Sequence, residues 1–426
     1  MKVLIISHNA VSTHQSMGKT FCTLFSKFKK SELCQLYIYP TIPNIDFCDS
    51  YYRITDKDVL KGLFSRNVNG RMIGKEEISA DSSLFENKKN ESFYRNRKNY
   101  TSIRKLARDF MWSMSPWFNT NLKKWLDKQK ITHIFIAPGG YKFIYDIALK
   151  CAKYLNVPIV TYECDEFFFV KKKKNYFDRF QQFLLNRKIK MLMSKTSLII
   201  TISNDLKNLY EPYFRVHAET IMTATSYIDQ NKSKNVEHIK ELTYMGNIRC
   251  NRYVSLLEIG LALDEINTQN NTAYSLKIYT GEKDSYILSE LQKAKSIKIM
   301  GFVSGKAFED VFLSAQTLLH VEAFDEESID TVKNSISTKI ADSLGFGNLL
   351  VAYGPSNVAS MRHLCENGAA FVINKKNDLK QELLHLFTLS EKERYNIVEN
   401  ALSTARKYHT IESNGRKLYR LMNDIN

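Results

Sequence analysis

The sequence predicts an α/β protein with two doubly wound parallel-sheet domains. Short apolar runs alternate with segments whose apolar residues recur at helical spacing, a pattern typical of parallel sheets covered by helices on both faces. The alternation occurs in two sets, separated by the irregular stretch 215–238. The length of 426 residues also exceeds the roughly 150 residues of an average domain. Ligands of such sheets bind beyond the carboxyl ends of the strands, so we expect a site in a cleft between two facing domains.

The first set gives the N-terminal domain, which we expect over residues 1–225. Residues 57–100 interrupt it, and their polar, irregular composition predicts a long loop or insertion. Strands are expected at 2–7, 36–39, 132–137, 158–162 and 198–202, with helices at 17–30, 101–128, 141–155, 177–193 and 204–213.

The second set gives a C-terminal domain, expected over residues 226–405. The last segment, 406–426, is expected to be a helix that returns toward the N-terminal domain. Strands are expected at 242–245, 275–279, 297–299, 318–321, 349–352 and 370–373.

Composition excludes several classes of protein. The apolar fraction of 44 % with only 7 Pro and 16 Gly excludes disordered and collagen-like chains. The apolar runs are far shorter than the roughly 20 residues that cross a bilayer, and the run after Lys2 lacks the features of a signal peptide. Seven scattered cysteines without a C-x-x-C pair predict reduced thiols. We therefore expect a cytoplasmic protein without a metal or a resident cofactor.

The charge is unevenly distributed. The net charge is +16, and residues 1–230 carry 37 basic and 21 acidic residues, against 24 of each in the remainder. A basic half joined to a neutral half indicates that one domain faces an anionic partner, such as a membrane or a pyrophosphate-bearing acceptor. No nucleic-acid partner is expected, because nothing resembles a reading helix, a zinc finger or an RNA-binding signature.

Aromatic residues accompany the basic ones. All three tryptophans, Trp112, Trp117 and Trp125, lie in one window between basic flanks, and 167–170 is a second aromatic run followed by Lys171–Lys174. This combination is typical of helices at the surface of an anionic membrane, and we consider peripheral contact at the inner face of the cell membrane. Aromatic residues at helical spacing are equally typical of a protein core, so both interpretations stay open.

Two short motifs resemble phosphate or metal sites but fit them poorly. Gly18-Lys19-Thr20 lacks the first glycine of a P-loop, because position 13 is Thr13. What remains is Gly18 at the start of a predicted helix, where backbone N–H groups suit an anion. Asp56-Lys57-Asp58 has an acid-x-acid form, but it precedes a predicted helix that Asp56 can cap.

The second half carries a more specific constellation. Glycines follow three predicted strands, and two cations and an acid accompany them in the order expected of a nucleotide-sugar site. The cations can neutralise a diphosphate and the acid can bind ribose hydroxyls. The residues are Gly246 with Asn247, Arg252, Gly281, Gly301 with Phe302 and Val303, Lys339 and Asp342.

Over nearly the whole chain, this order of segments resembles the family-four glycosyltransferases of the GT-B fold, whose two domains are Rossmann-like. The bacterial members that build capsule, exopolysaccharide or lipopolysaccharide are the most similar. The resemblance implies that Gly246 and Arg252 contact the donor diphosphate and that Asp342 contacts the donor ribose. It places Lys339 in an S-T-K motif that recurs among members.

The resemblance also assigns positions around the donor base and in the N-terminal domain. Gly301-Phe302-Val303 resembles the segment that holds the base, and Gly18 sits where the family's N-terminal glycine loop meets the donor. His8, after the first predicted strand, matches a catalytic-region histidine. The resemblance thus implies catalytic roles for Arg252, Lys339 and His8.

The sequence departs from the family where the transferred sugar is held. The paired-glutamate motif would place its first acid at position 334, which is Asn334. Either Asn334 substitutes for that acid, or an acid of the preceding loop does. Candidates for sugar or acceptor contact are Asn334, Glu322, Asp325, Glu326, Glu327, and Glu163 or Asp165 after another strand.

The resemblance implies a glycosyltransferase that moves a sugar from a nucleotide diphosphate donor to a glycan or a polyprenyl-pyrophosphate-linked acceptor. Retention of anomeric configuration and independence of metal are further implications. The alternatives are a GT-B sugar-nucleotide epimerase and, less favoured, a basic nucleic-acid-binding protein.

Overall fold

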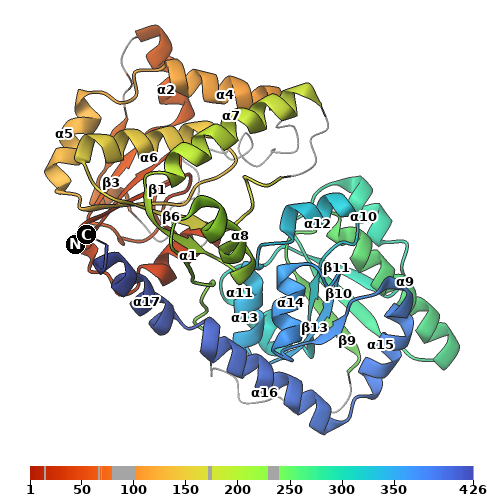
Figure 1. Ribbon diagram of the computed structural model, residues 1–426. Coiled ribbons are helices and arrows are strands. Elements are labelled where there is room, and N and C mark those ends of the chain that lie inside the picture. The colour runs from red at the N-terminus through yellow and green to blue at the C-terminus, as the bar shows by residue number, and fades with distance from the viewer. Residues whose placement is uncertain are drawn as a thin grey trace. The chain divides into compact units, whose positions relative to one another are not determined.

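The computed structural model describes residues 1–13, 16–65, 68, 70–78, 102–170, 175–228 and 239–425, and these form two compact units (Figure 1). One unit contains Met1–Met222 and Glu412–Asn426, and the other contains Thr223–Ile411. From the sequence, the boundaries were expected after residues 225 and 405. Each unit contains one mainly parallel sheet with helices on it, which confirms the predicted fold class.

The described residues of the first unit form a sheet of order β4-β3-β2-β1-β5-β6-β7-β8. All neighbours are parallel except β3 and β4, which are antiparallel. Three of these strands, β3, β4 and β8, were not predicted. The strands are β1 (Val3–Ser7), β2 (Leu33–Tyr37), β3 (Ser50–Arg53), β4 (Arg71–Ile73), β5 (His133–Ile136), β6 (Ile159–Glu163), β7 (Thr196–Thr201) and β8 (Ala218–Thr220).

Both faces of this sheet are buried. Alternate side chains of β1 point to opposite faces of the sheet and belong to two different hydrophobic cores. Leu4 and Ile6 pack with α4 to α8, whereas Val3 and Ile5 pack with α1 and the C-terminal helix α17. The helices are α1 (Ser16–Leu24), α2 (Asp56–Ser65), α4 (Ser102–Met114), α5 (Thr120–Gln129), α6 (Lys142–Leu155), α7 (Tyr176–Met193), α8 (Asn204–Phe214) and α17 (Ile411–Asn423).

The expected irregular insertion 57–100 is partly regular, which corrects the prediction. Its first part is the helix α2, which buries Val59, and β4 then extends the edge of the sheet. Residues 79–100 lie outside the described part. Asp56 accepts hydrogen bonds from Arg108 Nε at 2.9 Å and from Trp112 Nε1 at 2.8 Å. Its carboxylate therefore links α2 to α4, and the acid-x-acid motif has a structural role here.

The tryptophans belong to the core, so the interpretation that they contact a membrane is wrong. Trp112, Trp117 and Trp125 are buried, and the Trp112 ring stacks on Phe143 at a centroid distance of 4.5 Å. Trp125 Nε1 donates to Ser50 Oγ at 2.8 Å. Lys171–Lys174, the second part of that hypothesis, lie outside the described residues.

The second unit is a six-stranded parallel sheet of order β11-β10-β9-β12-β13-β14. Its strands are β9 (Glu241–Met245), β10 (Ser275–Tyr279), β11 (Ile297–Gly301), β12 (Thr317–Val321), β13 (Leu349–Tyr353) and β14 (Phe371–Ile373). Its helices are α9 (Arg252–Asn270), α10 (Ser285–Leu291), α11 (Lys306–Ser314), α12 (Glu326–Val332), α13 (Thr338–Gly345), α14 (Ala359–Glu366), α15 (Leu379–Thr388) and α16 (Glu391–Tyr408).

Candidate active site

The strand order of the second unit defines where a ligand can bind. Numbered along the chain within this unit, the order is 3-2-1-4-5-6, as in dinucleotide-binding sheets. The strand order reverses between the first strand, β9, and the fourth, β12, which are parallel neighbours. A crevice forms at such a point beyond the carboxyl ends of the strands. Here those ends lead into Gly246 after β9 and Glu322 after β12.

The turn after β9 is shaped by its backbone. Gly246 has a φ of +152°, and its N–H donates to the carbonyl of Tyr279 at 2.9 Å. Cys250 and Asn251 both adopt left-handed backbone conformations, with φ of 53° and 52°. The helix α9 then begins at Arg252. This sequence of turns brings the first side chain of the helix back over the end of the sheet.

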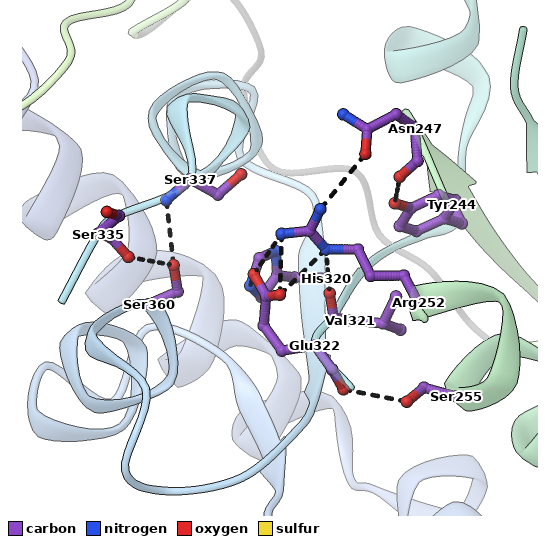
Figure 2. A network of polar contacts seen from close by, with 10 residues as sticks. All are labelled: Tyr244, Asn247, Arg252, Ser255, His320, Val321, Glu322, Ser335, Ser337 and Ser360. Atoms are coloured by element: carbon purple, nitrogen blue, oxygen red, sulfur yellow. Dashed lines mark hydrogen bonds and ion pairs between the residues drawn. The ribbon is translucent and has the colours of Figure 1, made fainter. Parts of the chain in front are cut away.

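Arg252 is held by an acid from the neighbouring strand (Figure 2). Its Nε and Nη2 donate to Glu322 Oε2 and Oε1, each at 3.0 Å, in a bidentate pair. Nε also donates to the Val321 carbonyl at 3.1 Å, and Nη1 donates to Asn247 Oδ1 at 3.3 Å. His320 Nε2 lies 3.3 Å from Glu322 Oε1. Glu322 therefore fixes the guanidinium, and its expected contact with the transferred sugar stays a prediction.

Burial and pairing oppose each other in this ion pair. Burial alone would raise the pKa of Glu322, but His320 and the Arg252 guanidinium hold it below its usual value. Burial alone would lower the pKa of the Arg252 guanidinium. The Glu322 carboxylate has the larger effect, so this pKa is raised above its ordinary value. Both groups are therefore ionised at neutral pH, with only 2 % of the Glu322 side chain exposed.

Lys339 is the second cation, and its surroundings differ from those of Arg252. Its Nζ lies so close to Gly246 that a Cβ built on this glycine would be 1.6 Å from it. The same Nζ is 5.8 Å from the centre of the Tyr244 ring. Among the described residues, no carboxylate lies within ion-pair distance of Lys339. Burial and the nearby Arg252 charge lower the pKa of Lys339 to about 8. Within the described part of the chain, the nearby Glu322 carboxylate favours the ammonium but forms no ion pair with it.

Both cations line one cavity beside β9 and β12. Its polar lining also includes the side chains of Ser337 and Ser343, and aromatic residues of α11 close one side. Two cations beside glycine backbone and serine hydroxyls suit an anion with several oxygens, such as a diphosphate. Sequence reasoning missed Ser337, Ser343 and the partnership of Arg252 with Glu322.

The segment expected at the donor base lies at the carboxyl ends of β10 and β11. Gly281 follows β10, and a Cβ there would meet the ring of Phe302 at 3.3 Å. Gly301 ends β11 with a φ of +84°, and nothing lies within 4 Å of a Cβ built on it. The Phe302 ring is 75 % exposed and Val303 is partly buried. An exposed ring next to open backbone is suited to stacking with a base.

The remaining predicted residues of this unit have structural partners. Asp342 lies on α13, one turn from Lys339, and its Oδ1 accepts from Thr225 Oγ1 at 2.8 Å. Asp342 is buried and does not line the cavity. Asp325 caps α12, accepting from the Ser328 N–H at 2.9 Å. Asn334 lies in the turn between α12 and α13.

Other predicted residues belong to the first unit. His8 follows β1 at the equivalent reversal of that sheet, between β1 and β5. Its ring is surrounded by Tyr39, Tyr141 and Phe143, with centroid distances of 5.7 to 5.8 Å. Gly18 is buried in α1, where a Cβ would meet the Ser12 backbone at 2.6 Å. This close packing explains the glycine without a ligand.

Two predicted acids lie at the carboxyl end of β6, Glu163 as its last residue and Asp165 just beyond it. Glu163 is buried, its Oε1 has no hydrogen-bond partner among the described residues, and burial raises its pKa to about 8. Asp165 is exposed. Glu166, which the sequence analysis did not single out, accepts from the backbone of Phe168 and Phe169 at 2.7 and 2.8 Å and shapes the loop. Glu163 is therefore a neutral acid at pH 7.

No group of three or more potential ligand residues is placed to hold a metal ion in the part of the chain that the structure describes. Asp58 accepts from the Thr55 N–H at 2.9 Å, and Asp56 pairs with Arg108. No helix among the described residues has the length and apolar character needed to cross a bilayer.

Two Rossmann-like units of this kind define the GT-B fold, and solved structures share it along their whole length. Anabaena HepE in complex with UDP is 9 % identical, with a TM-score of 0.61 and 100 % of both chains covered. Sucrose-phosphate synthase from Thermosynechococcus elongatus is 9 % identical, with a TM-score of 0.64 over 99 % of this chain and 98 % of that one.

An α,α-trehalose-phosphate synthase (UDP-forming) from Burkholderia vietnamiensis is 10 % identical, with a TM-score of 0.60 and 100 % of both chains covered. No family model and no curated protein matches the sequence. At these identities the likeness concerns the fold.

Proposed function

We propose that this protein is a glycosyltransferase that uses a nucleoside diphosphate sugar as its donor. The observation that carries the proposal is the pair of cations, Arg252 and Lys339, lining one cavity at the strand-order reversal of the second unit. The fold supports it, because structures with the same fold have been solved with UDP and with UDP-glucose. Membership in glycosyltransferase family four is part of the proposal.

The chemistry follows from the leaving group. When the bond to the sugar breaks, negative charge develops on the nucleoside diphosphate, and preorganised cations stabilise it without reorganising. Arg252 is preorganised by its bidentate pair with Glu322, and Lys339 supplies a second charge that forms no ion pair with a carboxylate of the described residues. The two cations act in place of a metal ion, and transfer retains the anomeric configuration.

The acceptor is a glycan or a polyprenyl-pyrophosphate-linked sugar of a polysaccharide pathway, used at the cytoplasmic face of the membrane. The support is the charge of the chain, because the excess of basic residues lies in residues 1–230. A pyrophosphate acceptor at an anionic membrane matches that charge.

Calorimetric titration with UDP tests the donor site. Wild type should bind UDP, whereas Arg252→Ala and Lys339→Ala should bind weakly and transfer sugar about 30-fold to 1,000-fold more slowly, the loss expected for a charge-assisted contact. Lys375→Ala is the matched control, because that side chain is 74 % exposed and is not among the residues that line the cavity. Near wild-type transfer by both variants would refute the site. Turnover of a nucleotide sugar without any acceptor would instead identify an epimerase.

A further inference from the structure

Two adjacent helices of the first unit, α4 and α7, present large apolar side chains to solvent. The helices contact each other, and Ser102 of α4 donates a hydrogen bond to Asp178 of α7 (Figure 1). Phe110 is 66 % exposed, Phe183 63 % and Tyr176 86 %. We name this surface the α4–α7 face, and it consists of Ile103, Phe110, Met114, Tyr176, Phe177, Phe180 and Phe183, all more than half exposed.

The exposed side chains follow the helical repeat. On α4, Ile103, Ala107, Phe110 and Met114 are spaced four, three and four residues apart and are all exposed. Tyr176, Phe180 and Phe183 follow the same spacing on α7. Each helix therefore carries an apolar stripe on its outer side, because residues at these spacings share one face.

The inner sides of the two helices combine apolar core residues, such as Trp112 on α4 and Leu185 on α7, with polar ones. Arg108 of α4 forms its buried ion pair with Asp56, and Asp109 accepts from the Phe143 N–H at 3.0 Å. On α7, Gln181 donates to the Gly140 carbonyl at 3.2 Å and Gln182 to the Phe167 carbonyl at 2.6 Å. The buried polar residues are satisfied inside, and the phenylalanines still face outward although the inner side of α7 already gives the core an apolar face. A contiguous exposed apolar surface of this kind marks an interaction site.

The charges beside this face are positive. Arg179 and Arg187 of α7 and Arg104 of α4 are exposed. The two acids of these helices are withdrawn from the surface, since Asp109 is buried and Asp178 accepts from Ser102. An occupant that matches this surface is apolar and carries negative charge at its edge.

We propose that the α4–α7 face docks on an anionic lipid bilayer, with the aromatic rings in the headgroup boundary and the arginines on lipid phosphates. Interfacial helices combine these residue types for the same reason, because apolar burial and anionic lipid act together. Docking on lipid brings the protein to the lipid-linked acceptor of the proposed function, and its biological purpose rests on that function. The physical interaction can be tested separately from transfer.

Flotation with phosphatidylcholine vesicles, with and without phosphatidylglycerol, tests the surface. Wild type should float only with the anionic vesicles and be released by salt. The double variant Phe180→Ser/Phe183→Ser should bind them at least about tenfold more weakly. Arg179→Gln/Arg187→Gln should lose about 25-fold at low salt, since each cation contributes about fivefold. The control Tyr286→Ser/Tyr395→Ser removes exposed aromatic rings from the second unit and should bind like wild type.

Thermal unfolding with and without UDP checks each variant's fold and its donor site. Equal binding of wild type to both kinds of vesicle, or to neither, would overturn the membrane proposal, as would unaltered binding by a folded phenylalanine variant. A wild-type dimer that this variant dissociates would make the face a contact between copies and also overturn it. Failure to bind UDP with retained flotation would overturn the proposed function and leave the membrane surface standing.

Discussion

Replacing Glu322 with glutamine separates the two roles that an acid at this position can have. In the structure the carboxylate holds Arg252 through two hydrogen bonds of 3.0 Å and is almost fully buried. Glutamine keeps the shape and one acceptor but removes the charge. The variant therefore leaves a buried guanidinium without its counterion in the empty protein. A residue that only touched the sugar would leave the empty protein's stability unchanged.

The magnitude follows from the burial of the pair. Removing one partner of a buried ion pair costs about 3 to 5 kcal/mol, and the retained hydrogen-bonding capacity of glutamine favours the lower end. The second unit spans Thr223–Ile411, and a domain of that size loses about 2 to 4 °C per kcal/mol. We expect the melting temperature to fall by about 6 to 12 °C. A bound nucleoside diphosphate supplies negative charge to Arg252, so UDP should stabilise the variant more than it stabilises wild type.

Thermal unfolding with and without UDP is the assay, and Asp310→Asn, which removes an exposed carboxylate from the same unit, is the control. The folded-state pKa of Glu322 is below its ordinary 4.5, so its contribution is present above that pH and is lost as the pH falls. The difference between wild type and variant should therefore shrink in acid. An unchanged melting temperature at pH 7, or equal stabilisation of both proteins by UDP, would refute the positioning role.

Four further predictions follow from particular contacts. Burial lowers the pKa of Lys339 to about 8, so the empty protein should gain stability as the pH rises from there toward the ordinary 10.5, and Lys339→Met should remove that slope in thermal unfolding. Gly246→Ala should weaken UDP binding by at least about tenfold in calorimetry, because its methyl group displaces the Lys339 ammonium; unchanged affinity would contradict this. UDP binding and transfer should persist in excess EDTA, and a loss that Mg²⁺ restores would contradict the role of the two cations in place of a metal ion. Trp112→Ala should cost about 3 to 5 kcal/mol of unfolding free energy and leave vesicle binding per folded molecule unchanged.

The fold was predictable because burial on both faces of a parallel sheet gives short, continuous apolar runs such as Val3–Ser7 and Leu349–Tyr353. The elements that were missed have weaker signals. β4 has three residues, with Arg71 and Met72 at least partly exposed, and α2, of which only a start beside Asp56 was expected, buries only Val59 and Gly62. Their pattern depends on tertiary neighbours, since the edge of the sheet and α4 supply the partners.

The tryptophans and the donor site show why side-chain roles are harder to predict than elements. Basic flanks beside Trp112 fit a membrane helix and a core helix equally well, and only packing against Phe143 separates the two. Glu322 was one of several acids considered for the sugar contact, because it lies near the family's missing acid in sequence, and that contact stays a prediction. The partner of Glu322 in the structure, Arg252, is 70 residues away. The two residues meet in space because β9 and β12 are neighbours in the sheet.

The 3-2-1-4-5-6 order makes the Arg252–Glu322 pair a consequence of topology. A side chain just after the first strand and one just after the fourth must meet at the reversal, and here one is a cation and the other an acid. The pair is neutral as a unit, so among the described lining residues Lys339 gives the cavity its net positive charge. A diphosphate that enters can share Arg252 with Glu322 and take Lys339 as its undivided partner. The lysine should therefore dominate charge recognition, while the arginine, held at a fixed angle, should dominate orientation of the departing phosphate.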